Sequence, residues 1–263
     1  MKYFICVGHA NYGGGVISSA DGTSKGGVNE YKYNKELAPY VCKWLKAAGH
    51  EATLCIAPEG QLHSLNDEIK YFIEEEHKQN YDLSVQLHLN AFNGAAYGCL
   101  ACCYNANGLP EAQRISAKLG TVWHNRGAEV RPGLYWTRKT KAKAVLVESF
   151  FCDNQDDYAK AKKLGMDAHG KLIAEGILGK TITIAPAQPK AKYYIQAGAY
   201  GTKENADVMV KVLKKKGFSA SIRKVAGSVP YRVQVGNYRT KKAANKVVKK
   251  LKAAGVTVLV KSL

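Results

Sequence analysis

Hydrophobic and polar residues alternate strictly in one central stretch of the chain. The apolar positions are Val85, Leu87 and Leu89, and the polar positions between them are Gln86, His88 and Asn90. This period of two predicts a β-strand with one face turned to the core, and the Ala-Phe-Asn-Gly sequence at 91–94 predicts the turn that ends it. Open α/β sheets bind ligands at the carboxyl ends of their strands. His88 is therefore a candidate site residue, although an isolated histidine is more often structural or simply exposed.

Strand-like and helix-like segments alternate through the first 180 residues. Short apolar runs predict strands at residues 2–8, 52–56, 83–89, 97–104 and 144–148, and a short extended piece at 134–136. Apolar residues at helical spacing predict helices from Asn29-Glu30 onward and at 64–77, 110–124, 155–164 and 168–178. The run at 144–148 is almost continuously apolar, as in a strand that is covered on both faces. We therefore expect an α/β domain with a largely parallel sheet.

Glycine and proline mark irregular features of the N-terminal part. Residues 11–27 are rich in glycine and serine and form a segment long enough to be a functional loop. In the helix that starts at Asn29-Glu30, Pro39 should introduce a kink or delay the start of the helix. Gly49 is well placed to cap its C-terminal end.

The last part of the chain contains an internal repeat. Gln196-Ala-Gly198-Ala-Tyr200 recurs as Gln234-Val-Gly236-Asn-Tyr238. Each copy has the pattern strand, helix, strand, which predicts a small α+β (βαββαβ) domain at residues 192–263, with one four-stranded sheet, two helices on one face and the other face open to a ligand. Residues 181–191 have the composition of a linker, so the predicted domains are 1–180 and 192–263.

Positive charge is concentrated in the second predicted domain. The chain carries a formal net charge of +18. Residues 186–263 contain 18 lysines and arginines but only two acids, Glu204 and Asp207, which leaves the rest of the chain almost neutral. Such a charge attracts anionic partners over a distance, although it could equally be an ordinary solvated surface.

Cysteine usage and hydropathy restrict the class of protein further. The seven cysteines form no paired Cys-x-x-Cys knuckles, and Cys99 and Cys102 should point to opposite faces of one strand, so we expect reduced thiols. The N-terminal apolar run is too short for a signal peptide, and no run approaches the about 20 apolar residues of a membrane helix. We expect a protein that is made in the cytosol and has no membrane anchor.

Three predicted strand ends and one helix start carry side chains able to bind a metal. His9, His88 and Glu148 lie at the strand ends, and Glu30 opens the first helix. Two imidazoles and a carboxylate suit Zn²⁺ with one position left for water, and a second carboxylate could move a proton. The four residues are far apart in the sequence, so their spacing leaves a structural role open for each.

The same residues carry a resemblance to a known family. Val7-Gly8-His9, Asn29-Glu30, Leu87-His88-Leu89-Asn90-Ala91 and Val147-Glu148-Ser149-Phe150-Phe151 occur in the order seen in the zinc-dependent N-acetylmuramoyl-L-alanine amidases of the amidase-3 family. Over residues 1–180 the chain looks most like endolysins of phages that infect clostridia. The resemblance implies that His9, Glu30 and His88 bind Zn²⁺ and that Glu148 is the catalytic carboxylate. It also implies a twisted, mostly parallel sheet flanked by helices.

One loop departs from the family pattern. Many members follow the first histidine with Gly-Gly and a loop containing aspartate, whereas Ala10-Asn11-Tyr12-Gly13-Gly14-Gly15 follows His9 here. This departure puts the substrate contacts of the loop in doubt, but not the histidine itself. Asn90 directly follows the His88 strand and is a candidate substrate contact, with packing or turn formation as the alternative.

The C-terminal repeat resembles a SPOR domain, a module that binds peptidoglycan, typically glycan strands stripped of their stem peptides. Gln196, Tyr200, Gln234 and Tyr238 match its recurrent pattern. The resemblance makes these four residues candidate glycan contacts, and ordinary packing within the sheet is the alternative for each.

Both resemblances together imply a peptidoglycan hydrolase that cleaves the amide bond between N-acetylmuramic acid (MurNAc) and L-alanine by zinc-activated water. The stem peptide and MurNAc would bind the first domain and glycan strands the second. The enzyme would leave the bacterial cytoplasm after the membrane is permeabilised, either as a phage endolysin with a holin or as a sporulation autolysin that lyses the mother cell. A non-catalytic basic protein that binds wall polymer or nucleic acid is the alternative from another class, and the chain lacks a basic–aromatic signature of a nucleic-acid fold.

Overall fold

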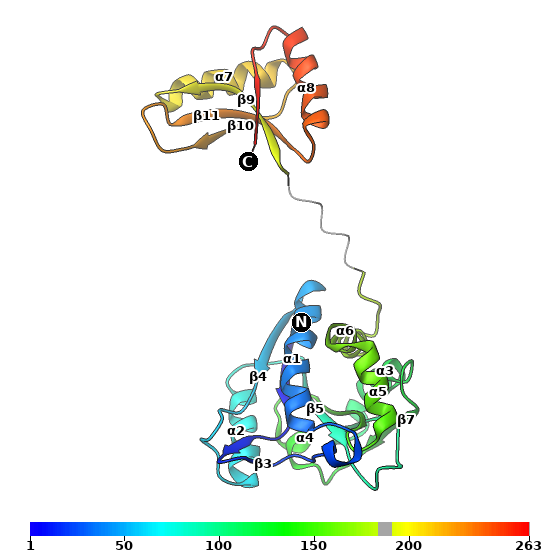
Figure 1. Ribbon diagram of the computed structural model, residues 1–263. Helices are drawn as coiled ribbons and strands as arrows, with labels where there is room; N and C mark the ends of the chain where they lie inside the picture. Colours follow the sequence, from blue (N-terminus) through cyan, green and yellow to red (C-terminus); the bar gives the residue numbers. More distant parts are fainter. Residues whose placement is uncertain (184–190, 263) are drawn as a thin grey trace. The chain divides into compact units, whose positions relative to one another are not determined.

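A computed structural model describes residues 1–183 and 191–262 of the protein (Figure 1). The chain divides into two compact units, Met1–Ile184 and Ala185–Leu263. Most of the predicted linker at 181–191 lies outside the described residues. Among the helices that the structure describes, none is long and apolar enough to cross a membrane.

The first unit is built on a six-stranded sheet. In spatial order its strands are β4 (Glu51–Cys55), β1 (Lys2–Val7), β5 (Leu83–Asn90), β8 (Ala144–Phe151), β6 (Cys99–Cys103) and β7 (Asn125–Val130). All neighbouring pairs are parallel except β8 and β6, which run antiparallel. The predicted mostly parallel sheet is confirmed, and the carboxyl ends of β1, β5 and β8 meet at one edge.

Helices cover both faces of this sheet. α1 (Glu30–Ala47), α3 (Leu109–Leu119), α5 (Gln155–Leu164) and α6 (Met166–Leu178) pack on the face that carries Val85 and Leu87. α2 (Leu65–His77) and α4 (Tyr135–Lys139) contribute Phe72 and Trp136 to the core on the opposite face. The alternation in β5 therefore separates an apolar face from Gln86 and His88, which lie on the side of α2 and α4.

Two predicted elements differ in the structure, and one observed strand was not predicted. Residues 134–136 are not an extended piece, because α4 begins at Tyr135 and buries Trp136. The helix expected to continue to residue 124 ends at Leu119, where Gly120 follows. Strand β7 was not predicted, because its sequence, Asn-Arg-Gly-Ala-Glu-Val, is largely polar and its side chains are exposed or half-buried at the edge of the sheet.

The N-terminal segment also differs from expectation at two places. α1 runs from Glu30 to Ala47 without interruption by Pro39. Pro39 is exposed, so the N–H that proline lacks is missing on the solvent side, while the opposite side of the helix stays packed on the sheet. Within the glycine-rich segment, β2 (Asn11–Gly13) and β3 (Val16–Ile17) form a short antiparallel hairpin directly after His9.

The second unit is a four-stranded antiparallel sheet with two helices on one face. Its strands lie in the order β10 (Ala220–Lys224), β11 (Tyr231–Tyr238), β9 (Tyr193–Tyr200) and β12 (Leu259–Ser262). α7 (Lys203–Lys215) and α8 (Lys241–Ala253) bury Leu213 and Leu251 against it. The predicted small α+β domain is confirmed.

Candidate metal centre

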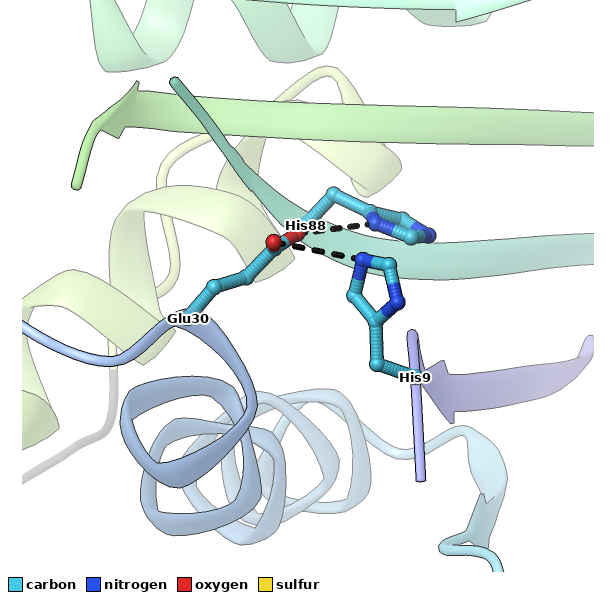
Figure 2. A group of neighbouring side chains, drawn as sticks. All are labelled: His9, Glu30 and His88. Atoms are coloured by element: carbon cyan, nitrogen blue, oxygen red, sulfur yellow. Dashed lines mark hydrogen bonds and ion pairs between the residues drawn. The ribbon is translucent and has the colours of Figure 1, made fainter. Parts of the chain in front are cut away.

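His9, Glu30 and His88 meet at the carboxyl edge of the large sheet (Figure 2). His9 follows β1, Glu30 is the first residue of α1, and His88 lies near the end of β5. One possible ligand atom from each residue lies within 4.8 Å of the others. The three positions converge because β1 and β5 are neighbouring parallel strands, and because α1 starts beside them at Asn29, whose side chain accepts a hydrogen bond from the Lys32 N–H.

The Glu30 carboxylate lies between the two imidazoles. Its Oε1 is 2.9 Å from Nδ1 of His88 and accepts the Leu89 N–H at 3.0 Å. Its Oε2 is 3.2 Å from Nε2 of His9. Burial by itself would raise the pKa of Glu30, but the hydrogen bonds with His88 and His9 hold this pKa well below its ordinary value. Glu30 is therefore ionised, as a metal ligand must be.

Gly8 makes room for the imidazole of His88. A Cβ atom at position 8 would lie 2.3 Å from Nε2 of that ring, so any larger residue would displace it. Nε2 is buried and has no hydrogen-bond partner among the described residues. Burial opposes a charged imidazole, yet the hydrogen bond to Glu30 and the charge of that carboxylate raise the pKa of His88 above its ordinary value.

Glu148 lies beside His88 on the neighbouring strand. The two residues are register partners in the parallel pair β5–β8, so their side chains leave the sheet on the same face. Oε2 of Glu148 is buried without a hydrogen-bond partner in the part of the chain that the structure describes. Burial raises the pKa of Glu148 to about 7, while the nearby charge of His88 opposes the rise. A carboxyl group with this pKa can both accept and return a proton near neutral pH.

The sequence analysis missed a further carboxylate, which lies behind His9. Glu68 on α2 is 4% exposed, and its Oε1 lies 3.8 Å from Nδ1 of His9. Its Oε2 accepts hydrogen bonds from Ser18 and Tyr12. The one available signal was helical periodicity, because Glu68 shares a face with Leu65 and Phe72 and so falls on the inward side of α2.

A small cavity adjoins the two histidines on the side of α2 and α4. It has a volume of about 150 Å³, and its walls are mainly apolar: Leu65, Ile69, Phe72, Leu134 and Trp136. Apolar walls lower the local polarity and so strengthen the electrostatic interactions between the groups that face the cavity. The site therefore combines ionisable groups with an environment of low polarity.

Asn90 has a local role at the end of β5. Its Oδ1 accepts the backbone N–H of Ala91 at 2.9 Å, and its carbonyl oxygen accepts the N–H of Cys152 at 2.7 Å. These bonds stabilise the turn that follows the strand. The seven cysteines, Cys152 included, are buried and unpaired in the described residues.

The repeated glutamines and tyrosines of the second unit occupy different places. Gln196 and Gln234 are register partners on β9 and β11, and each lies between buried residues, so both point to the face away from the helices. Tyr200 and Tyr238 instead pack against the core of this unit. Their hydroxyl groups would lie 2.6 and 2.5 Å from a Cβ at Gly198 and Gly236, which explains why glycine and tyrosine recur two residues apart in both copies.

Solved structures with the same fold include amidases and the catalytic domain of an endolysin. The catalytic domain of the CD27L endolysin, which targets Clostridium difficile, is 47% identical with a TM-score of 0.66, and the match covers 70% of this chain and 99% of that domain. The N-acetylmuramoyl-L-alanine amidase AmiC2 of Nostoc punctiforme, at 21% identity and a TM-score of 0.57 over 68% of this chain and 96% of its own, shares the fold.

Sequence comparisons agree for the first unit and add an assignment for the second. An uncharacterised protein of Clostridium perfringens strain 13 is 32% identical over 189 residues, which are 69% of this chain and 53% of that protein. The chain thus spans about half the length of this curated relative. The SPOR domain family matches residues 189–262. The match to the N-acetylmuramoyl-L-alanine amidase family extends over residues 4–179 and includes every residue of the His-Glu-His cluster and Glu148, so the chain belongs to this amidase family.

Proposed function

We propose that the protein hydrolyses the amide bond between MurNAc and L-alanine in peptidoglycan, with zinc as its cofactor. The observation that carries the proposal is the convergence of His9, Glu30 and His88 within 4.8 Å, with Glu148 on the adjacent strand. Family membership supports the amide bond as the target. The 47% identity to an endolysin catalytic domain supports the wall as the place of action.

The residues at the cluster fit a zinc ion. Two imidazoles and one carboxylate are a common ligand set for catalytic zinc, which leaves a coordination position open. Nδ1 of His88 and Nε2 of His9 both face the Glu30 carboxylate, and the buried, unpartnered Oε2 of Glu148 is a group that the solvent of a bound ion would satisfy. When bound, zinc would polarise the amide carbonyl and lower the pKa of a water molecule.

Glu148 is the residue to which we assign the proton transfers. Its Oε2 is free of other hydrogen bonds in the described residues and lies in an environment that raises its pKa to about 7. As a carboxylate it accepts the proton of the attacking water, and as a carboxylic acid it returns that proton to the nitrogen of the departing L-alanine. Each oxygen of Glu30 contacts one imidazole in the metal-free protein, which holds the two histidines close together so that the three groups could share one ion.

We assign peptidoglycan recognition to both units. The stem peptide and MurNAc bind at the edge of the large sheet, where Asn90 is a candidate contact. Glycan strands bind the open face of the small sheet. Gln196 and Gln234 are the proposed contacts there because they point away from the helices, and Tyr200 and Tyr238 support them from the core side.

The similarity to an endolysin catalytic domain favours a role in phage lysis over a role in mother-cell lysis. In that role the protein reaches the wall after a holin permeabilises the membrane. The presence or absence of a holin gene beside the coding sequence distinguishes these two roles.

Digestion of purified cell walls tests the proposed reaction. The protein should release new N-terminal alanine without new reducing sugar ends, lose this activity in the presence of a chelator, and regain it on addition of zinc. Reducing ends without new alanine would exclude an amidase. Undiminished alanine release after complete metal removal would exclude the metal centre, and the absence of any cleavage would favour a binding protein.

A further inference from the structure

We propose that Glu68 positions His9 as a metal ligand through a hydrogen-bond relay that runs from Nδ1 of His9 to Ser18 and then to Glu68. This inference rests on the proposed metal site and adds a residue that lies outside the ligand set. Ser18 Oγ is 3.5 Å from Nδ1 of His9 and 2.6 Å from Oε2 of Glu68. Glu68 Oε1 is itself 3.8 Å from Nδ1.

The direction of the relay follows from the hydrogen-bond capacity of Ser18. A serine hydroxyl has one proton to donate and can accept two hydrogen bonds. Its proton goes to Oε2 of Glu68 at 2.6 Å and not to the carbonyl oxygen of Ala10 at 3.4 Å, because the shorter contact is the stronger hydrogen bond. It accepts the backbone N–H of Ala10 at 3.0 Å, which leaves one acceptor position for His9. Nδ1 of His9 therefore carries the ring proton.

This tautomer leaves the correct nitrogen of His9 free for a metal. Nε2 donates a hydrogen bond to Glu30 at 3.2 Å in the metal-free protein, and because Nδ1 keeps its proton, Nε2 is the nitrogen that would release its proton and offer a lone pair to a metal. A carboxylate behind a histidine ligand fixes the orientation of the ring and increases its basicity. Glu68 lies in this position behind His9.

His9 needs such support because its backbone is strained. With φ of +70°, it is the single non-glycine residue in the left-handed region among the described residues, a conformation that costs about 1–2 kcal/mol for residues with a Cβ atom. Glu68 also accepts the Tyr12 hydroxyl at 3.0 Å. One buried carboxylate thus holds both strands of the hairpin that follows His9, and α2 becomes part of the metal site.

Glu76 on the same helix provides a matched control. It is also a buried carboxylate, but it accepts the Ser84 hydroxyl and the N–H groups of Lys141 and Ala142. Its bonds anchor a loop, and its one histidine contact among the described residues is with His77 at 3.8 Å, not with His9 or His88. Replacement of either carboxylate should destabilise the fold, and only replacement of Glu68 should affect the metal site.

The decisive measurement is the zinc affinity of the full-length protein, determined by competition with a chromophoric chelator, together with the melting temperature of the metal-free protein. Glu68→Gln keeps the shape of the side chain and removes the charge. We expect its zinc affinity to fall about 10- to 100-fold, whereas Glu76→Gln should lower the melting temperature and leave zinc affinity within about twofold of wild type.

Ser18→Ala tests the relay if Glu68→Gln does not fold. It should also weaken zinc binding, and the double variant should be no weaker than Glu68→Gln alone, because the two residues act in one chain. Wild-type zinc affinity in Glu68→Gln, or additive effects of the two substitutions, would overturn the relay while leaving the metal site intact. Failure of the wild-type protein to bind zinc would instead overturn the proposed function.

Discussion

The two sheets of this protein carry their polar residues in opposite ways. In the large sheet, Glu30 opens a helix, His88 lies near the end of its strand and Glu148 lies within the neighbouring strand. All three side chains are largely removed from water, and their charges shift one another's pKa values. In the small sheet, Gln196 and Gln234 lie in the middle of neighbouring strands on a face without helices, where both are half-buried. The first arrangement brings ionisable side chains into direct contact with one another. The second distributes neutral hydrogen-bonding groups over a surface.

This difference suggests that the two sheets have different functions, proton transfer in the large sheet and polymer recognition in the small one. Proton transfer requires groups whose pKa values are shifted and whose positions are fixed, and burial provides both. Recognition of a long polymer requires many exposed groups, each of which contributes little. Substitutions in the large sheet should therefore have large effects that depend on pH, and those in the small sheet should have modest effects on binding alone.

The largest effect is expected for Glu148→Gln. The amide cannot take the proton of the attacking water, so alanine release from purified walls should fall about 10²- to 10⁴-fold, the usual contribution of general acid–base catalysis. Zinc binding should persist, because His9, Glu30 and His88 are unchanged. Glu51→Gln, at a side chain that is 74% exposed, is the control and should retain full activity. A Glu148→Gln protein with more than about one-tenth of wild-type activity would contradict the proton-transfer role.

The same substitution should change the stability of the metal-free protein in a pH-dependent way. The folded-state pKa of Glu148 is raised from 4.5 to about 7, so the contribution of this carboxyl group to stability is fully present below pH 4.5 and is lost as pH rises through 7. The free energy of unfolding of Glu148→Gln relative to wild type should therefore increase between pH 4 and pH 8, by on the order of 3 kcal/mol.

Tryptophan fluorescence is the appropriate probe for this measurement. Trp44, Trp123 and Trp136 all belong to the first unit, so denaturant titrations followed by their emission report unfolding of that unit alone. A difference between the two proteins that is constant from pH 4 to pH 8 would show that Glu148 titrates near its ordinary pKa. The claim that substitutions in the large sheet have pH-dependent effects, unlike those in the small sheet, would then be wrong.

The pattern of buried positions in each element explains which features could be predicted from sequence. Alternation at Val85, Leu87 and Leu89 identified β5 because one of its two covered faces is apolar and the other carries polar side chains. The repeat identified the small domain because both copies bury the same helix positions. α4 was missed because five residues that include one buried tryptophan give no helical period. β7 was missed because an edge strand needs no apolar face.

The candidate site shows the same limit. His9, His88 and Glu148 could be selected because they end predicted strands, which places them near an edge regardless of the details. Glu68 could not be selected, because its contact with His9 depends on how α2 packs against a hairpin about fifty residues earlier. The φ angle of His9 likewise depends on the hydrogen bonds of its neighbours. A contact that forms only when separate elements pack together leaves no pattern in the local sequence.

In the small sheet, the double substitution Gln196→Ala/Gln234→Ala should weaken binding to glycan strands about tenfold. Each lost hydrogen bond contributes about 0.5–1.5 kcal/mol, and the strands themselves should stay intact because neither side chain is in the core. Binding should be measured in the Glu148→Gln background, which does not digest the walls. Tyr200→Phe and Tyr238→Phe keep the packed rings and should change binding less than twofold. A larger loss of glycan binding in the tyrosine variants than in the glutamine double variant would mean that the tyrosines, not the glutamines, contact the glycan.

The smallest effect is expected from the lysines of α8, and it should disappear at high salt. Lys242, Lys246 and Lys249 are exposed and lie opposite the side of α8 that packs on the sheet. They can attract an anionic wall only through solvent, where charges beyond about 10 Å are screened at 0.1 M salt. Replacement of all three by glutamine should reduce wall binding a few-fold at low salt. It should leave binding unchanged at about 1 M salt, where the screening length falls to about 3 Å. A loss that persists at high salt would mean that these lysines contact the polymer directly, and the helical face would then join the sheet face as a binding surface.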